Sequence, residues 1–204
     1  MGDLNKSPAI ILRNEEAVSS VIETGSWRGE SAIWFAQKFD RVWSIERDFD
    51  YYKSCLEFTA YPQFSNLKFI YGHSAVELGY IMAEIRREKV RGFRAIADFC
   101  HTLFYLDAHW NAGNGQSRLE IECPLLDELS SIFKQTDVIP YILIDDAKYF
   151  TEGDPSGLHT PDQWPTLEQI KAALPEDYYT AVHNDFIVSV PQEAREVIER
   201  WQNE

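Results

Sequence analysis

The fold is decided by a short stretch in which an apolar strand runs through two glycines into a helix: Val21-Ile22-Glu23-Thr24-Gly25-Ser26-Trp27-Arg28-Gly29-Glu30-Ser31. Residues 17–22 are rich in Val, Ile and small side chains, which is typical of a buried strand. Residues 31–39 place apolar side chains at helical spacing. Gly25 can adopt the positive φ of a sharp turn, and Gly29 has no Cβ to obstruct a ligand. Because the first N–H groups of a helix lack partners, the turn is predicted to hold a ligand; the alternative is a tight turn that binds nothing.

Composition bounds the class of protein. The chain has 204 residues, 45% of them hydrophobic, which suffices for one sizeable core and predicts a single domain over residues 1–204. With 33 acidic and 19 basic residues the net charge is −14, so the average surface repels nucleic acid and anionic membranes. No leader-like segment and no membrane-length apolar run is visible, and the three cysteines are expected to be reduced. A cytoplasmic protein that binds neither nucleic acid nor membrane is expected.

Strand-like and helix-like segments alternate along the chain, which indicates an α/β fold. Besides the first strand and helix, strands are predicted at residues 41–45, 67–71, 102–106 and 138–144, a hairpin at 178–182 and 186–190, and helices at 49–59, 74–87, 124–134, 166–174 and 192–202. Residues 1–16 are predicted to form a short lid or helix, 91–99 are ambiguous, and 111–116 form a loop. The expected architecture is a Rossmann-like, doubly wound sheet of about seven strands, mostly parallel, with a C-terminal antiparallel hairpin.

Glu23, Gly25 and Gly29 match motif I of the class I S-adenosylmethionine-dependent methyltransferases, with Trp27 at the position of the middle glycine. The chain therefore resembles that family, in whose sheet the last strand alone runs antiparallel. The nicotinamide fingerprint Gly-x-Gly-x-x-Gly is not met, because Trp27 would stand where a pyrophosphate must approach closely. The resemblance implies S-adenosylmethionine as the cofactor and assigns its binding to the residues of the turn: Glu23, Thr24, Gly25, Ser26, Gly29 and Ser31.

Two further segments follow strands and are predicted to contact the same cofactor. Glu46 ends the second strand about 20 residues after the glycine turn, where an acidic side chain accepts hydrogen bonds from both ribose hydroxyls. A solvated strand-end carboxylate is the alternative. Gly72-His73-Ser74 resembles the family's Gly-Asp-Ser segment, which borders the adenine, with His73 in place of the acid. Ser74 followed by Glu77 equally fits a helix capping box.

Three carboxylates follow the fourth and fifth strands: Asp107 on one side, Asp145 and Asp146 on the other. If those strands are neighbours the three groups converge, and they repel one another unless a cation or protons neutralise them. Hard oxygen ligands suit Mg²⁺ or Ca²⁺. The arrangement resembles the divalent-metal-dependent O-methyltransferases of the catechol and macrocin types, which implies Mg²⁺ on Asp107, Asp145 and Asp146. The alternative is that Asp145 or Asp146 caps the next segment while Asp107 contacts only the methionine end of the cofactor.

The predicted activity is methyl transfer from S-adenosylmethionine to a hydroxyl of a small molecule, of sugar or phenol type. His109 or Asp107 would take the hydroxyl proton, since imidazole titrates near neutral pH. Trp110 and Tyr149 would wall the acceptor pocket or belong to the core. Two other classes stay open: a nucleotide-dependent oxidoreductase on the same fold, and a non-catalytic nucleoside-binding module. In the second case a partner subunit, for instance in a homo-oligomer, is expected to complete the site, because the region before the first predicted strand is short.

Overall fold

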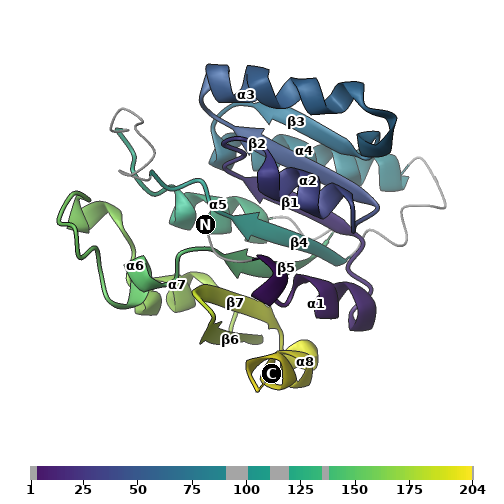
Figure 1. Cartoon of the computed structure of the whole chain (residues 1–204). Helices are drawn as coiled ribbons and strands as arrows, with labels where there is room; N and C mark the ends of the chain where they lie inside the picture. Colours follow the sequence, from purple (N-terminus) through teal and green to yellow (C-terminus); the bar gives the residue numbers. More distant parts are fainter. Residues whose placement is uncertain (1–3, 91–100, 111–119, 135–137, 204) are drawn as a thin grey trace.

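The computed structural model describes residues 4–90, 101–110, 120–134 and 138–203, and a seven-stranded sheet forms its centre (Figure 1). The strands are β1 (Ser20–Thr24), β2 (Arg41–Glu46), β3 (Leu67–Tyr71), β4 (His101–Leu106), β5 (Ile139–Ile144), β6 (Tyr178–His183) and β7 (Phe186–Pro191). Their order is β3-β2-β1-β4-β5-β7-β6. Strands β1 to β5 pair in parallel, and β7 runs antiparallel to both of its neighbours. The predicted Rossmann-like sheet with a C-terminal hairpin is confirmed.

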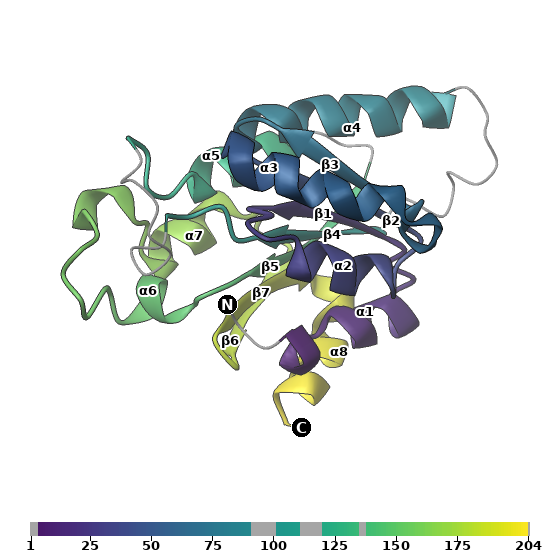
Figure 2. The same ribbon diagram turned by 45° about the horizontal axis from the view of Figure 1, so that its top comes forward.

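Helices cover both faces of the sheet (Figures 1 and 2). On one face lie α1 (Ala9–Glu15), α2 (Glu30–Ala36), α3 (Phe49–Cys55) and α8 (Arg195–Gln202); on the other lie α4 (Ser74–Val90), α5 (Leu125–Phe133) and α7 (Leu167–Ala173). The short helix α6 (Lys148–Thr151) follows β5 at the carboxyl edge. Because β1, β4 and β5 are neighbours and run in parallel, their carboxyl ends meet at a single edge of the sheet. Ligands bind at this edge in open α/β sheets.

The central strand β4 shows why the strands read as continuous apolar runs. Successive side chains of a strand point to opposite faces. Leu103 and Tyr105 join the core cluster under α1, α2 and α8, whereas Phe104 and Leu106 join the cluster under α4, α5 and α7. Since both faces are buried, no polar alternation is needed within the strand.

Most predicted strand boundaries agree with the structure to within one residue, but the first strand does not. Ala17 has φ 53°, which is incompatible with an extended chain, so β1 begins at Ser20 and continues to Thr24. The helix after it ends at Ala36, three residues before the predicted end. Helix α6, inside the long loop after β5, was not predicted.

The N-terminal segment contains the helical alternative, α1. The predicted ambiguous segment 91–99 and the loop 111–116 lie outside the described residues. Cys55 and Cys123 are free thiols, and Cys100 lies outside the described residues as well. In the described part of the chain, no helix combines the length and the apolar composition that crossing a bilayer requires.

Candidate functional site

The glycine turn after β1 contains one very close approach of two backbones. Gly25 has φ 87°, and a Cβ at this position would lie 2.2 Å from the carbonyl oxygen of Asp107. The N–H groups of Gly25 and Ser26 donate to the carbonyl of Ile45 at 2.9 and 3.1 Å, and the N–H of Asp107 donates to the carbonyl of Thr24 at 3.0 Å. The turn therefore joins the carboxyl ends of β1, β2 and β4, and only glycine fits at its centre.

Trp27, in the glycine turn, has a left-handed backbone conformation. Its φ is 45°, in the left-handed region, which costs a residue with a Cβ about 1 kcal/mol or more. Its N–H donates to Oε2 of Glu46 at 2.7 Å, and its ring lies edge-on to Tyr51 with the Arg28 guanidinium 4.5 Å from the ring centroid. These contacts offset the strain, so the turn keeps its shape without the middle glycine.

Glu46 holds the glycine turn from the neighbouring strand. It is buried, and its two oxygens accept the N–H groups of Trp27 and Asp48, each at 2.7 Å. Burial raises the pKa of Glu46, while these hydrogen bonds oppose the rise. Because each carboxylate oxygen has a second lone pair, the ribose contact predicted for Glu46 stays sterically open and remains a prediction.

Glu23 lies fully buried beneath the turn. Its Oε2 accepts the hydroxyl of Ser44, which is also 2.5 Å from the hydroxyl of Ser26. Among the described residues, Oε1 of Glu23 and the hydroxyls of Thr24 and Ser31 have no hydrogen-bond partner. Burial raises the pKa of Glu23 to about 7. Buried polar atoms without partners are rare in folded proteins, and their concentration here is typical of a place for a polar ligand or ordered water.

A second buried carboxyl, Glu128 of α5, faces the same edge from the other side of the sheet and was not predicted. Burial raises its pKa to about 7. Helix α4 begins at Ser74 itself, which places that residue in the first turn rather than at the cap of a capping box. Nδ1 of His73 is buried without a partner among the described residues. His73, Ser74 and Glu128 thus extend the polar lining of the turn.

Asp107, His109 and Asp146 come together at the carboxyl ends of β4 and β5, with one ligand atom of each within 4.8 Å of the others. Nε2 of His109 lies 3.1 Å from Oδ2 of Asp146, and its Nδ1 lies 3.6 Å from Oδ1 of Asp107. The side chains of His109 and Asp146 are almost fully buried. Burial and the neighbouring carboxylates of Asp145 and Asp146 raise the pKa of Asp107 well above its usual range. The structure thus places His109 within reach of both Asp107 and Asp146, whereas the predicted Mg²⁺ on Asp107, Asp145 and Asp146 remains a prediction.

Asp145, the third predicted metal ligand, has other contacts. Its Oδ2 accepts the hydroxyl of Tyr105 at 2.7 Å, and its Oδ1 accepts the N–H of Asp146 at 2.9 Å. Neither Asp145 nor Asp146 caps α6, whose cap position is Ala147. The structure thus brings Asp107 and Asp146 to the histidine and directs Asp145 towards Tyr105 in the sheet.

Lys148 neutralises part of this negative charge. Its ammonium lies 2.9 Å from Oδ1 of Asp146 and 3.0 Å from Oδ2 of Asp185 in the β6–β7 turn. Burial acts against ionisation of Asp146, but the hydrogen bonds and charges of His109 and Lys148 outweigh it and hold the pKa of Asp146 well below its usual range. Asp146 also has φ 55°, so strained backbone and paired charges coincide at this residue.

An aromatic cluster formed by Trp110, Tyr149, Phe150, His159 and Trp164 adjoins His109. Trp164 stacks on His159 with ring centroids 4.3 Å apart, and its centroid is 5.2 Å from that of His109. Trp110 is buried, as the core interpretation predicts, whereas Tyr149 lines a cavity.

Glu122 joins the two loops that carry this cluster. Its carboxylate accepts the N–H and hydroxyl of Thr160, both at 2.8 Å, and the indole N–H of Trp164 at 3.0 Å. Its carbonyl accepts the N–H of Trp110, and its own N–H donates to the side chain of Gln163. Glu122 is fully buried, so these bonds replace its hydration and fix the rings beside His109.

Replacing Glu122 with Gln is expected to lower the free energy of unfolding by about 1–3 kcal/mol, the contribution of hydrogen bonds to a charged acceptor. The amide of Gln would turn a donor towards the N–H of Thr160 or of Trp164. Urea unfolding followed by tryptophan fluorescence measures the loss. Glu120→Gln, which alters an exposed carboxylate two residues earlier, is the matched control and should change stability by less than about 0.5 kcal/mol. Equal effects of the two variants would contradict the role assigned to Glu122.

Of the site residues that were not predicted, Glu128 carried a readable signal. Leu125, Glu128 and Ile132 are spaced three and four residues apart, so they share one helix face, and that face is buried. An acid on an apolar helix face indicates a polar site within the core. Glu122 and Lys148 carried no such signal, because the partners of Glu122 and one partner of Lys148, Asp185, are distant in sequence.

Comparison of the chain with protein-family models and with curated protein sequences gives no match. Comparison with solved structures gives many, at low sequence identity. A Staphylococcus aureus protein provisionally assigned as a caffeoyl-CoA O-methyltransferase superposes with a TM-score of 0.59 at 13% identity, over 94% of this chain and 84% of its own. The O-methyltransferase TomG of Streptomyces achromogenes, solved with S-adenosylmethionine, gives 0.58 at 13% identity, over 94% and 81%.

A Bacillus cereus O-methyltransferase, solved with S-adenosylhomocysteine, gives a TM-score of 0.55 at 13% identity over 94% of this chain and 82% of its own. The chain has the methyltransferase fold. In this chain the glycine turn, Glu46 and the Asp107–His109–Asp146 cluster all lie at the carboxyl edge of the sheet.

Proposed function

We propose that this protein transfers a methyl group from S-adenosylmethionine to a hydroxyl of a small molecule. The observation that carries the proposal is the position of the Asp107–His109–Asp146 cluster directly against the glycine turn. The backbone of Gly25 touches that of Asp107, so a ligand held by the turn would lie next to the buried histidine. The methyltransferase fold of the chain supports the same cofactor.

The residues around the turn fit this cofactor chemically. The unpartnered atoms of Glu23, Thr24, Ser31 and His73 offer hydrogen bonds to a polar ligand. The negative charges of Asp107 and Asp146 suit a sulfonium cation, and the loss of that charge on methyl transfer would weaken the binding of the product. When bound, S-adenosylmethionine supplies an electrophilic methyl group.

The carboxylates of Asp107 and Asp146 also fit a divalent cation such as Mg²⁺. Both side chains offer hard oxygen ligands, and they lie close together beside His109. The ammonium of Lys148 occupies one oxygen of Asp146 and leaves the other beside His109. When bound, the cation supplies Lewis-acid and orienting effects on the acceptor hydroxyl.

His109 is the group that takes the hydroxyl proton. Asp146 accepts a hydrogen bond from Nε2, which selects the tautomer in which Nδ1 keeps its lone pair. As Nδ1 becomes protonated, the imidazolium is stabilised by Asp146 on one side and by Asp107 on the other. The rings of Trp164, Tyr149 and Phe150 keep water away from the same histidine.

Calorimetric titration with S-adenosylhomocysteine tests the proposal directly. We expect binding, and we expect Glu46→Ala to weaken it by about thirtyfold, because two ribose hydrogen bonds of about 1 kcal/mol each are lost. Since Glu46 also accepts the backbone N–H groups of Trp27 and Asp48, urea unfolding of Glu46→Ala measures how far the turn itself is loosened. If the protein binds a nicotinamide dinucleotide and does not bind S-adenosylhomocysteine, the result would indicate an oxidoreductase. Binding without turnover of any hydroxyl compound would favour a nucleoside-binding module.

A thermal-shift series with Mg²⁺ and with a chelator tests the cation. Mg²⁺ is expected to raise the melting temperature by mass action, because it binds the folded site and hardly binds the unfolded chain. Asp146→Asn should abolish most of that rise, whereas Asp145→Asn should keep it, since Asp145 is engaged by Tyr105 and by the N–H of Asp146. If both variants lose the Mg²⁺-dependent rise in melting temperature equally, Asp145 is a ligand as well. If Mg²⁺ does not raise the melting temperature of the unmodified protein, the proposed metal site is wrong.

A further inference from the structure

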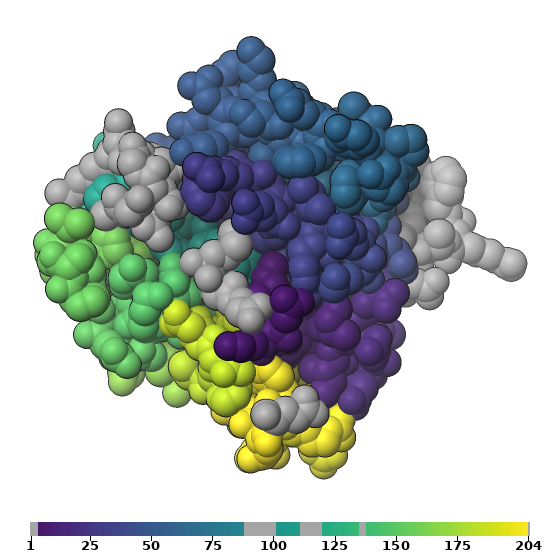
Figure 3. All heavy atoms as spheres, in the orientation of Figure 1, coloured from purple at the N-terminus to yellow at the C-terminus, as the bar shows by residue number. Residues whose placement is uncertain are grey.

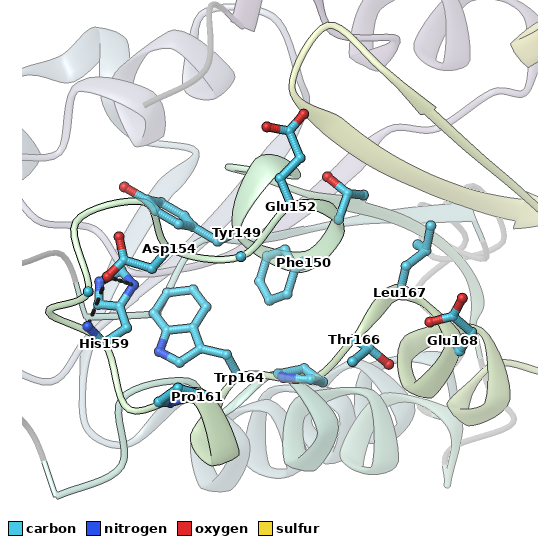
Figure 4. A pocket seen from close by; sticks show the side chains of 14 residues that line it. Tyr149, Phe150, Glu152, Asp154, His159, Pro161, Trp164, Thr166, Leu167 and Glu168 are labelled. Atoms are coloured by element: carbon cyan, nitrogen blue, oxygen red, sulfur yellow. Dashed lines mark hydrogen bonds and ion pairs between the residues drawn. The ribbon is translucent and has the colours of Figure 1, made fainter.

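A cavity of about 630 Å³ lies beyond the aromatic cluster, between α6 and the start of α7 (Figure 4). The segment that forms it follows β5 and makes up one flank of the molecule, drawn in green in Figure 3. Its apolar walls include the side chains of Tyr149, Phe150 and Trp164. Aromatic faces are electron-rich, and a positive charge near them is stabilised.

The polar side chains of the cavity have one sign of charge. Glu152, Asp154 and Glu168 line it, and Figure 4 shows their carboxylates on three sides of the rings. No Lys or Arg is among the lining residues that the structure describes. Within the described ranges no ion pair engages Glu152 or Glu168. Among these lining residues, the negative charges of Glu152 and Glu168 are therefore not paired with a cation.

Asp154 is fixed as an anion by its own loop. It accepts the hydroxyl and N–H of Ser156 and the N–H groups of Leu158 and His159, at 2.6 to 2.9 Å. The hydrogen bond from the Ser156 hydroxyl and those from the backbone N–H groups together hold the pKa of Asp154 well below its usual range. The loop thus presents a permanent negative charge at one end of the cavity.

His159, a buried side chain of the same cavity, also lacks a hydrogen-bond partner among the described residues. It lines the cavity and is only 8% exposed, and neither ring nitrogen forms a hydrogen bond with any described residue. Its nearest charged neighbour is Asp154, with Nδ1 3.6 Å from Oδ2. A buried imidazole normally satisfies at least one nitrogen, so a ligand hydroxyl or N–H is the group that would complete it.

The cavity is separate from the proposed methyl-transfer site. His109 is not among its lining residues, and Trp164, Tyr149 and Phe150 lie between the two, with ring centroids 5.2 to 6.3 Å from that of His109. The same rings therefore form a wall of both sites. One of them already carries a cation, since the ammonium of Lys148 lies 5.1 Å from the centroid of Tyr149.

We propose that this cavity binds an organic ammonium group, held against the rings of Phe150 and Trp164 and between the carboxylates of Glu152, Asp154 and Glu168. A hydroxyl or N–H elsewhere on the same ligand would pair with His159. The ligand class is thus a small amine or quaternary ammonium compound with a polar group a few bonds away. The proposal does not depend on methyl transfer at His109.

Choline and its uncharged isostere 3,3-dimethylbutan-1-ol provide the test, because both carry the same shape and the same hydroxyl. Each is titrated into the purified protein, and the indole N–H signal of Trp164 is followed by NMR, assigned with Trp164→Phe. Choline should bind at least about fivefold more tightly than the isostere, as expected for a cation on aromatic faces. Equal affinity of the two compounds, or no shift of the Trp164 signal with choline, would overturn the proposal.

A charge-matched pair of double variants tests the carboxylates. Glu152→Gln with Glu168→Gln removes two exposed carboxylates of the cavity, and should weaken choline binding by about threefold to tenfold at low salt without affecting the isostere. Glu193→Gln with Glu196→Gln removes two exposed carboxylates at and just before α8, well away from α6 and α7 in Figures 1 and 2. The control should leave choline binding unchanged. If both pairs weaken it equally, choline is responding to the net charge of −14 and the cavity is not a site.

Discussion

Gly25→Ala is expected to lower the free energy of unfolding by about 3–5 kcal/mol and to abolish binding of S-adenosylhomocysteine. The new Cβ would lie 2.2 Å from the carbonyl oxygen of Asp107 and 3.0 Å from Cα of Ala108. Both contacts are with backbone, which cannot rotate away as a side chain can. Relief requires β1 and β4 to separate at their carboxyl ends, and that is where the proposed cofactor and catalytic residues meet.

Gly153→Ala is the matched control for this substitution. Gly153 has φ 82°, close to the 87° of Gly25, but a Cβ there meets nothing within 4 Å. It should therefore show only the backbone cost of a left-handed alanine, about 1 kcal/mol. Chemical denaturation of the two variants separates the clash from the dihedral cost. If both variants lose the same stability, the close approach of Gly25 to Asp107 does not constrain the turn.

His109→Gln is expected to lower kcat by about 10²- to 10⁴-fold, the range of a general base. Gln cannot take the hydroxyl proton, although it keeps a polar side chain in the space beside Asp146. The rate is measured as S-adenosylhomocysteine formed from S-adenosylmethionine with an acceptor found by screening hydroxyl compounds. The dissociation constant of S-adenosylhomocysteine should change by less than about threefold, because the proposed role of His109 is in the proton transfer.

His183→Gln serves as the control, since this histidine packs against Trp201 near α8 and lies outside the Asp107–His109–Asp146 cluster. It should leave the rate unchanged. A loss of less than about fivefold in His109→Gln would assign the proton to another acceptor, Asp107 being the next candidate. A parallel loss of rate and of S-adenosylhomocysteine binding would point to a collapsed site instead of a missing base.

The order of elements was readable from the sequence because each strand of a doubly wound sheet is buried on both faces. β4 and β5 are apolar runs that end just before Asp107 and Asp145, and their ends could be placed to within one residue. The meeting of Asp107 with Asp146 followed from the same logic, since neighbouring parallel strands end at one edge. β1 was misplaced because the left-handed φ of Ala17 has no signature in composition.

The finer distribution of roles could not be read in the same way. Asp145 and Asp146 are adjacent in sequence, but the left-handed φ of Asp146 aims the two carboxylates at different partners, Tyr105 and His109. Trp27 interrupts the glycine motif, yet its backbone has a left-handed conformation and donates a hydrogen bond to Glu46. Both outcomes depend on contacts between residues far apart in the chain.

The bridge from Lys148 to Asp185 implies an order of assembly. Asp185 follows Lys148 by 37 residues and accepts both its ammonium and its N–H, while the carbonyl of Asp185 accepts the N–H of Ala147. During synthesis the residues up to Asp146 emerge before the β6–β7 turn exists. Lys148 can pair with Asp146 as soon as both have emerged, whereas the second carboxylate on its ammonium and the acceptors of two backbone N–H groups arrive only with the final hairpin. A ribosome-bound chain halted before Asp185 would therefore keep the ion pair of Lys148 with Asp146 but lack the contacts that tie Ala147 and Lys148 to the hairpin.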